Sequence, residues 1–266
     1  MFLTSMSAYS NLAEYLQYLS PSFYKSRYFK KLKNLNPTNI IERKVEPEFL
    51  WIKNYLTKDA VFIDIGANVG AYLYVLETLL RSKNIFAFEP NPELNGRLKR
   101  LFPKIHVFSS ALSDENTTAE FKIPVIKGQK VHSRGTLQTQ LKEKDEEKTI
   151  LQKVQVVKMD DLNLKTSNID FIKIDVEGNE MKTLRGAKQT ILKHRPTLMV
   201  EMEQRHHDES LWSLISEIEN WGFSANYLDR ETLTLKRLTE EFILLQNADN
   251  VKNYQFYINN IIFIPN

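Results

Sequence analysis

The chain has 266 residues, no cysteine and a formal net charge of +3, from 36 basic and 33 acidic side chains. The lack of cysteine excludes disulfide scaffolds, cysteine-ligated zinc, iron–sulfur clusters and thiol nucleophiles, and it fits a cytoplasmic protein. The small positive excess argues against a protein built mainly to hold nucleic-acid phosphates. We expect no signal peptide and no transmembrane helix, because no apolar run approaches about 18 residues.

Residues 1–45 are predicted to form a helical extension in front of the main domain. The stretch 8–35 is rich in tyrosine and helical in pattern, with a break at Ser20-Pro21. Its second half carries five basic residues and no acid, a pattern that could bind phosphate, anionic lipid or an acidic substrate. We favour the simpler interpretation of a solvated helix whose apolar side chains pack inward: Phe23, Phe29 and Leu32.

Residues 46–266 are predicted to form one α/β domain. Short apolar runs, typical of strands buried on both faces, alternate with segments whose apolar residues recur every three or four positions, as on one helix face. The predicted strands cover 60–63, 85–88, 105–108, 169–174, 197–200 and 254–264. The predicted helices cover 69–80, 92–101, 181–191 and a segment with Asp208 near its start and Gly222 at its end. This alternation predicts a Rossmann-like, doubly wound, mostly parallel sheet.

An insertion at about 115–158 interrupts the alternation. Residues 121–123 and 154–157 have strand-like composition, and 142–148 is a charged segment that predicts a loop. We therefore expect a β-rich insertion here in place of a crossover helix.

Polar residues follow four predicted strands, at the edge where doubly wound sheets bind their ligands. These segments are Asp64-Ile-Gly-Ala-Asn-Val-Gly70, Glu89-Pro-Asn-Pro92, Asp175-Val-Glu-Gly178 and Glu201-Met-Glu203. A dinucleotide site needs a glycine where this chain has Asn68, because the backbone must approach a pyrophosphate. This disfavours a nicotinamide dehydrogenase. Glu89 is placed to accept the hydroxyls of a ribose, so the pattern suggests a nucleoside without pyrophosphate, as in S-adenosylmethionine.

Five segments together resemble the FkbM family of class I S-adenosylmethionine-dependent methyltransferases. They are VFIDIGANVGAY (61–72), FAFEPNP (86–92), SSALSD (109–114), DFIKIDVEGNEMKTLRGA (170–187) and LMVEME (198–203). The resemblance covers roughly residues 46–266. It implies S-adenosyl-L-methionine as cofactor and O-methylation of hydroxyls on sugars or natural products. It also implies that the insertion lies near the substrate mouth, where Arg134 could hold an anionic group.

The expected cofactor-binding residues come from the same segments. The resemblance implies that the first turn holds the methionine end of the cofactor, that Glu89 and Pro90 lie at the ribose, and that Ser110 and Ala111 lie by the adenine. The turn residues are Asp64, Gly66, Ala67, Asn68 and Gly70, and Asp175 completes the set. The alternative for Glu89 is a helix-capping acid beside Asn91.

A general base would help methyl transfer, because a sugar hydroxyl is barely acidic at neutral pH. The catalytic candidates at the predicted edge are Asp175, Glu177, Glu201, Glu203 and His206, with Asp175 first. Strand alternation predicts that Asp175 and Glu177 point to the same side. We expect no metal; the alternative is a divalent cation held by Glu203, His206 and His207 with Asp175.

The sequence therefore predicts a cytoplasmic O-methyltransferase with a carbohydrate, glycoside or other small-molecule hydroxyl acceptor. One alternative is a nucleic-acid methyltransferase that grips phosphates with its basic N-terminal helix. Another is a non-catalytic module that only binds a nucleoside. A homo-oligomer is compatible with the sequence.

Overall fold

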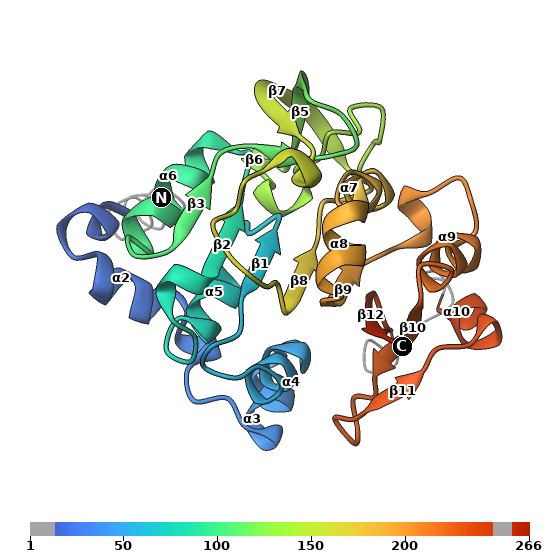
Figure 1. Ribbon diagram of the computed structural model, residues 1–266. Coiled ribbons are helices and arrows are strands. Elements are labelled where there is room, and N and C mark those ends of the chain that lie inside the picture. Colours follow the sequence, from blue (N-terminus) through green and yellow to red (C-terminus); the bar gives the residue numbers. More distant parts are fainter. Residues whose placement is uncertain (1–13, 247–256) are drawn as a thin grey trace.

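The computed structural model describes residues 14–246 and 257–266. Its centre is an eight-stranded sheet in the order β11-β10-β12-β9-β8-β1-β2-β3 (Figure 1). The strands β1 (Phe62–Ile65), β2 (Ile85–Phe88), β3 (His106–Phe108), β8 (Phe171–Ile174) and β9 (Thr197–Glu201) are parallel. The remaining strands, β12 (Asn260–Pro265), β10 (Phe223–Leu228) and β11 (Leu235–Arg237), each pair antiparallel with their neighbours. This confirms the predicted Rossmann-like, mostly parallel sheet.

Helices cover both faces of the sheet (Figure 1). One face packs against α2 (Pro21–Tyr28), α4 (Glu48–Tyr55), α5 (Ala71–Leu76) and α6 (Pro92–Leu101), with α3 (Pro37–Arg43) just before α4. The other face packs against α7 (Glu180–Gly186), α8 (Lys188–His194), α9 (Leu211–Glu219) and α10 (Glu240–Leu245). Single 3₁₀ turns lie at Lys30–Leu32, Ser82–Asn84, His132–Arg134, Met159–Asp161 and Gln204–His206.

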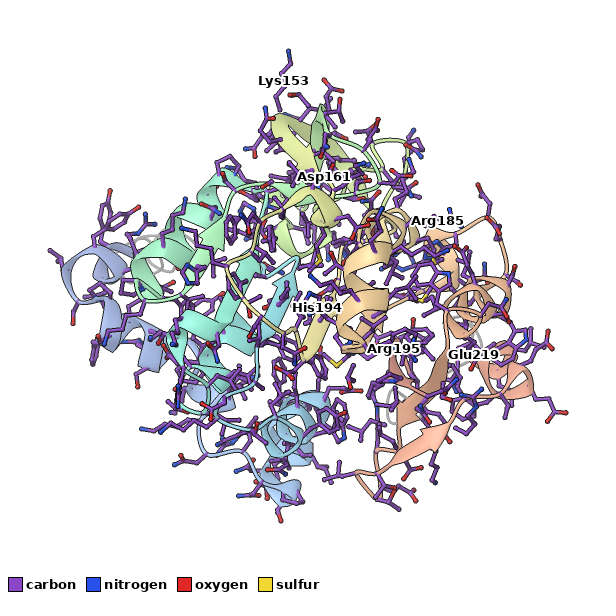
Figure 2. All side chains as sticks on the ribbon, in the orientation of Figure 1. Lys153, Asp161, Arg185, His194, Arg195 and Glu219 are labelled. Carbon is purple, nitrogen blue, oxygen red and sulfur yellow. The ribbon has the colours of Figure 1, made fainter. Side chains whose placement is uncertain are left out.

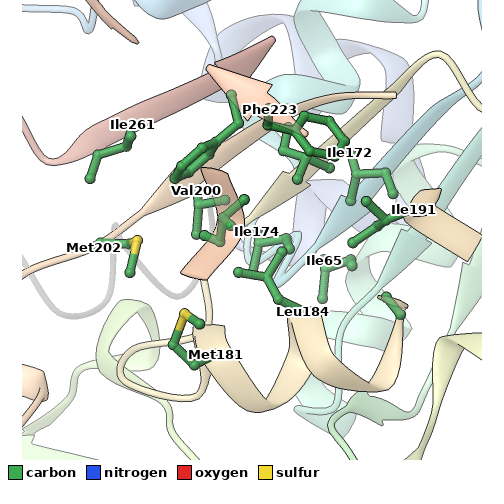
Figure 3. Packing of buried hydrophobic residues seen from close by; sticks show 14 of the residues in the cluster. Ile65, Ile172, Ile174, Met181, Leu184, Ile191, Val200, Met202, Phe223 and Ile261 are labelled. Carbon is green, nitrogen blue, oxygen red and sulfur yellow. The ribbon is translucent and has the colours of Figure 1, made fainter. Parts of the chain in front are cut away.

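The central strands are apolar throughout because each of their faces meets helices. Phe62 and Phe171 face the α5 side, whereas Ile65, Ile172 and Ile174 face the α7 side. On that second side, the isoleucines meet Met181 and Leu184 of α7 and Ile191 of α8 (Figure 3). Burial of each such side chain contributes about 1.5–3 kcal/mol, so the site at the strand ends rests on a rigid core.

The insertion folds as a second sheet with the order β4-β7-β5-β6. Its strands are β4 (Ala111–Leu112), β5 (Thr117–Ile126), β6 (Gln129–Lys130) and β7 (Glu146–Val157). Phe121, Ile123 and Val154 form its small core, while Lys153 projects into solvent (Figure 2). The β-rich insertion is thus confirmed, but the loop predicted for 142–148 is too long, because β7 begins at Glu146 and pairs with β5 there.

Several predicted boundaries differ from the structure. The helix predicted for 69–80 ends at Leu76, and the one predicted for 181–191 is divided into α7 and α8. Ser210, rather than Asp208, caps α9, with its hydroxyl accepting the Ser213 N–H at 3.2 Å. The final strand begins at Asn260. Residues 8–13 and 254–256 of the predicted elements lie outside the described residues.

The N-terminal extension is helical over residues 14–19 and in α2, with the expected break at Ser20-Pro21. Phe29 packs inward as predicted, but the prediction for Phe23 is wrong, because 57% of this side chain is exposed. Within the described residues, no helix is long and apolar enough to cross a bilayer.

Candidate functional site

A pocket opens where β1, β2 and β8 end. Its empty space, about 540 Å³, includes open solvent. The predicted site residues that line it are Gly66, Asn68, Glu89, Pro90, Ser110, Ala111, Asp175 and Glu177. The insertion supplies one wall with Phe121, His132, Ser133, Gly135 and Leu137. The sheet therefore brings together residues that are more than a hundred positions apart in the sequence.

The turn after β1 is tightly constrained. Gly66 and Asn68 have φ angles of +80° and +49°, in the left-handed region. A Cβ atom on Gly66 would lie 1.9 Å from the carbonyl oxygen of Asp175, so only glycine fits. The N–H groups of Gly66 and Ala67 donate to the Phe88 carbonyl at 2.9 and 3.0 Å. The turn is thereby fixed between the ends of β2 and β8.

Asn68 offers an unused acceptor in this turn. Its Oδ1 is buried and has no hydrogen-bond partner among the described residues, and the residue lines the pocket. A buried amide oxygen without a partner is unfavourable, so a ligand N–H group at this position would stabilise the site.

Glu89 connects the turn after β1 to the segment after β2 by two hydrogen bonds. Its Oε2 accepts the Asn68 N–H at 2.8 Å and its Oε1 accepts the Asn91 N–H at 2.9 Å. Burial raises the pKa of Glu89 to about 7, against the lowering effect of these two hydrogen bonds. The helix cap itself belongs to Asn91, whose side chain accepts the Glu93 N–H at 3.0 Å. Glu89 therefore both supports the turn and lines the pocket.

A buried lysine, not expected from the sequence, pairs with the pocket residue Asp175. Lys173 Nζ is 3.1 Å from Asp175 Oδ2 and 3.8 Å from Asp64 Oδ1. Burial raises the pKa of Asp64 to about 6, and the Lys173 charge opposes this. Asp64 does not line the pocket but lies under the turn. The available signal was a lysine inside the apolar strand FIKI, because a buried charge needs a partner.

Asp175 and Glu177 lie together in the pocket lining. The side chain of Asp175 is 27% exposed. Burial and the charge of Asp175 raise the pKa of Glu177 to about 8. Strand alternation is the wrong reason for their proximity, because β8 ends at Ile174 and Glu177 adopts a left-handed φ of +51°. A turn, rather than a strand, presents both carboxyl groups.

Glu201 and Glu203, two other predicted catalytic residues, lie outside the pocket lining. Glu201 Oε1 accepts a hydrogen bond from Asn259 Nδ2 at 2.7 Å, and burial with the Asp175 charge raises its pKa to about 9. Glu203 accepts hydrogen bonds from Arg205 Nε at 2.9 Å and from the Tyr257 hydroxyl at 2.8 Å. Although burial opposes it, these donors hold the pKa of Glu203 below its usual value.

The two histidines face different acids. His206 Nε2 is 3.5 Å from Glu177 Oε2, and His207 Nε2 is 3.3 Å from Glu180 Oε2. Burial lowers the pKa of His206. Over residues 14–246 and 257–266, no group of three or more histidine and acidic side chains is placed to hold a metal ion.

The insertion is fastened to the segments that follow β8 and β9. Thr136 Oγ1 donates to the Glu177 carbonyl at 2.7 Å. Glu143 joins the insertion to the segment after β9, with Arg134 at 2.7 Å and Arg205 at 3.1 Å from its carboxylate. Arg134, expected to hold an anionic group, is thus engaged by Glu143.

Like Asp64, two further residues expected to bind the cofactor, Ala67 and Gly70, are absent from the pocket lining. Ala67 is 5% exposed. Gly70 precedes α5 with a φ angle of +87°, and a Cβ atom there would meet Leu98 and Phe102, each at 2.7 Å. Both residues shape the turn from which Gly66 and Asn68 reach the pocket.

The strand order and the pocket at the strand ends are those of a Rossmann-like, doubly wound sheet. The Methyltransferase FkbM domain model matches residues 64–241 of this chain. The chain therefore belongs to the FkbM methyltransferase family.

Individual relatives are more distant. The AMB antimetabolite synthetase AmbE of Pseudomonas aeruginosa is 32% identical over 95 residues, which are 33% of this chain and 4% of that protein. A crystal structure of methyltransferase FkbM from Methylobacillus flagellatus is 15% identical with a TM-score of 0.48, over 78% of this chain and 44% of that one. A TehB-like SAM-dependent methyltransferase from Corynebacterium glutamicum is 10% identical with a TM-score of 0.46, over 86% of this chain and 94% of that one. The chain thus spans less than half the length of the first two.

Proposed function

We propose that this chain is an S-adenosyl-L-methionine-dependent O-methyltransferase acting on a hydroxyl of a carbohydrate, glycoside or natural product. The observation that supports the proposal is the pocket that combines the Gly66 turn, Glu89 and the Asp175–Glu177 pair. The first two features suit a nucleoside without pyrophosphate, and the carboxyl pair suits an acceptor hydroxyl.

The pocket residues fit this cofactor. The unpartnered Asn68 Oδ1 would accept a hydrogen bond from the amino-acid end, and Glu89 would accept those of the ribose hydroxyls. Ser110 and Ala111 would lie by the adenine. When bound, the cofactor supplies an electrophilic methyl group on a sulfonium sulfur.

Asp175 is the proposed general base and Glu177 the second candidate. The carboxylate would orient the acceptor hydroxyl and take its proton as the oxygen–carbon bond forms and the methyl–sulfur bond breaks. Correct positioning of the two reactants supplies a large part of such a rate enhancement. A base with a pKa of about 8, the value for Glu177, is well matched to proton transfer near neutral pH.

Transfer of a radiolabelled methyl group to a panel of sugars, glycosides and alcohols tests the proposal, with nucleic acid as the comparison. We expect label in a hydroxyl acceptor. Asp175→Asn should bind S-adenosylhomocysteine normally but turn over roughly 10²–10⁴-fold more slowly. The control Glu120→Gln alters an exposed acid of the insertion and should leave turnover unchanged. Label only in nucleic acid would contradict the proposed acceptor class.

Asp175 and Glu177 are separated by the pH dependence of turnover. If Glu177 is the base, the rate of the wild type should rise up to about pH 8, and Glu177→Gln should abolish that rise. If Asp175 is the base, Glu177→Gln should keep most of the turnover.

A further inference from the structure

The N-terminal helical region presents an unusual surface. In the described residues, five of the eleven exposed large apolar side chains lie between residues 15 and 28. Leu19 is 82% exposed and Phe23 is 57% exposed, and the two flank the Ser20-Pro21 break where the two helices meet. Scattered exposed apolar residues are normal, but a cluster marks an interaction surface.

This surface is held rigidly on the domain. On the inner side of the region, the Phe29 ring stacks on Tyr74 of α5 with 4.8 Å between centroids. Lys25 Nζ is 2.7 Å from Glu77 Oε2, and α2 lies beside α6 (Figure 1). The exposure of Phe23 is thus a consequence of how α2 is anchored.

The outer side of α2 and the 3₁₀ turn that follows it are basic. Arg27 lies four residues after Phe23 and therefore on the same side of α2, and Lys30 and Lys31 follow in the 3₁₀ turn. Arg27, Lys30 and Lys31 are exposed, as is Lys33. In the part of the chain that the structure describes, none of these four side chains has an ion-pair partner, and residues 21–35 include no acid.

We propose that this surface, defined by Leu19, Phe23, Arg27, Lys30 and Lys31, binds an anionic lipid bilayer. Exposed large apolar side chains beside lysine and arginine bind an anionic membrane by placing the apolar groups at the acyl boundary and the cations at the headgroups. The charge of the surface complements anionic headgroups. Leucine has no ring to stack on a base, so the most exposed apolar residue favours a bilayer over nucleic acid.

Co-sedimentation with vesicles tests the proposal, using vesicles of phosphatidylglycerol and phosphatidylcholine in equal parts and vesicles of phosphatidylcholine alone. The full chain should sediment with the anionic vesicles and bind the neutral ones much less. The double variant Leu19→Ser with Phe23→Ser should weaken binding tenfold or more, roughly in proportion to the apolar area lost. Replacing Arg27, Lys30 and Lys31 with glutamine should weaken it roughly a hundredfold, about fivefold per charge.

Matched controls remove the same kinds of side chain elsewhere. Leu244 and Leu245 of α10 are 66% and 68% exposed, and their replacement by serine should not change vesicle binding. Lys153→Gln, at the solvent-facing position in β7 (Figure 2), should reduce it by less than the cation triple variant. Unaltered melting temperatures would show that the variants remain folded.

Three results would overturn the proposal. The first is no sedimentation with anionic vesicles. The second is wild-type vesicle binding by both N-terminal variants. The third is binding to a nucleic-acid duplex with no binding to vesicles, which would assign the same cations to phosphates of another kind.

Discussion

Replacement of Glu89 by glutamine separates a ligand-binding role from a structural one. Each carboxylate oxygen accepts one backbone N–H, from Asn68 at 2.8 Å and from Asn91 at 2.9 Å. Glutamine has the same shape but only one oxygen, so one of these N–H groups would face an NH₂ donor. The loss of one hydrogen bond to a charged group costs about 1.5–3 kcal/mol.

The same replacement also removes an unfavourable buried charge. Burial raises the pKa of Glu89 from 4.5 to about 7, which corresponds to about 3 kcal/mol. The unfolded chain ionises this group near its usual pKa, so the folded state loses that stability as the pH rises from about 4 to above 7. Because that pKa already includes the lowering effect of the two hydrogen bonds, we expect the free energy of unfolding of Glu89→Gln at about pH 8 to be no lower than that of the wild type.

Binding should respond differently from stability. If Glu89 holds the ribose, loss of the carboxylate should weaken the affinity for S-adenosylhomocysteine roughly 10–150-fold. Urea unfolding measures the free energy of unfolding, and titration calorimetry measures the affinity for S-adenosylhomocysteine. The control Glu93→Gln changes an exposed acid of α6, the helix that follows Glu89, and should leave affinity unchanged. A variant of Glu89 that is much less stable but binds with wild-type affinity would refute the ribose assignment.

Two further substitutions test the floor of the pocket. Gly66→Ala should abolish binding of S-adenosylhomocysteine, because its Cβ would lie 1.9 Å from the Asp175 carbonyl oxygen. Gly128→Ala controls for backbone strain in the same calorimetric assay. Gly128 has a similar φ of +70°, and a Cβ atom there would meet nothing within 4 Å. Lys173→Met should lower the free energy of unfolding by about 3–5 kcal/mol, because it leaves Asp64 and Asp175 without their cation. In thermal unfolding, this loss should be smaller at about pH 5 than at about pH 8, since Asp64, with a pKa of about 6, takes up a proton; an equal loss at both pH values would contradict the pairing.

The sequence predicts the parts of the fold that local patterns determine. The helix α6 lies where expected because Asn91 and Pro92 form a cap followed by leucines at helical spacing. The strand β2 has its predicted bounds because four apolar residues stand between polar turns. The turn residues Gly66 and Asn68, together with Glu89, line the same pocket because parallel strands end at one edge.

The parts that were missed depend on contacts across the chain. The role of Lys173 requires knowing that Asp64 lies on the neighbouring strand. The exposure of Phe23 follows from the anchoring of α2 by Phe29 and Lys25, which no local pattern shows. The C-terminal strands β10 and β11 are defined by pairing with β12 and with each other.

Titration calorimetry of the purified chain with S-adenosylhomocysteine, with NAD in parallel, tests the central claim most directly. The proposed pocket should bind the homocysteine nucleoside and not the dinucleotide, because Asn68 stands where a pyrophosphate would need a glycine. Binding of NAD without binding of S-adenosylhomocysteine would contradict the assignment of the pocket.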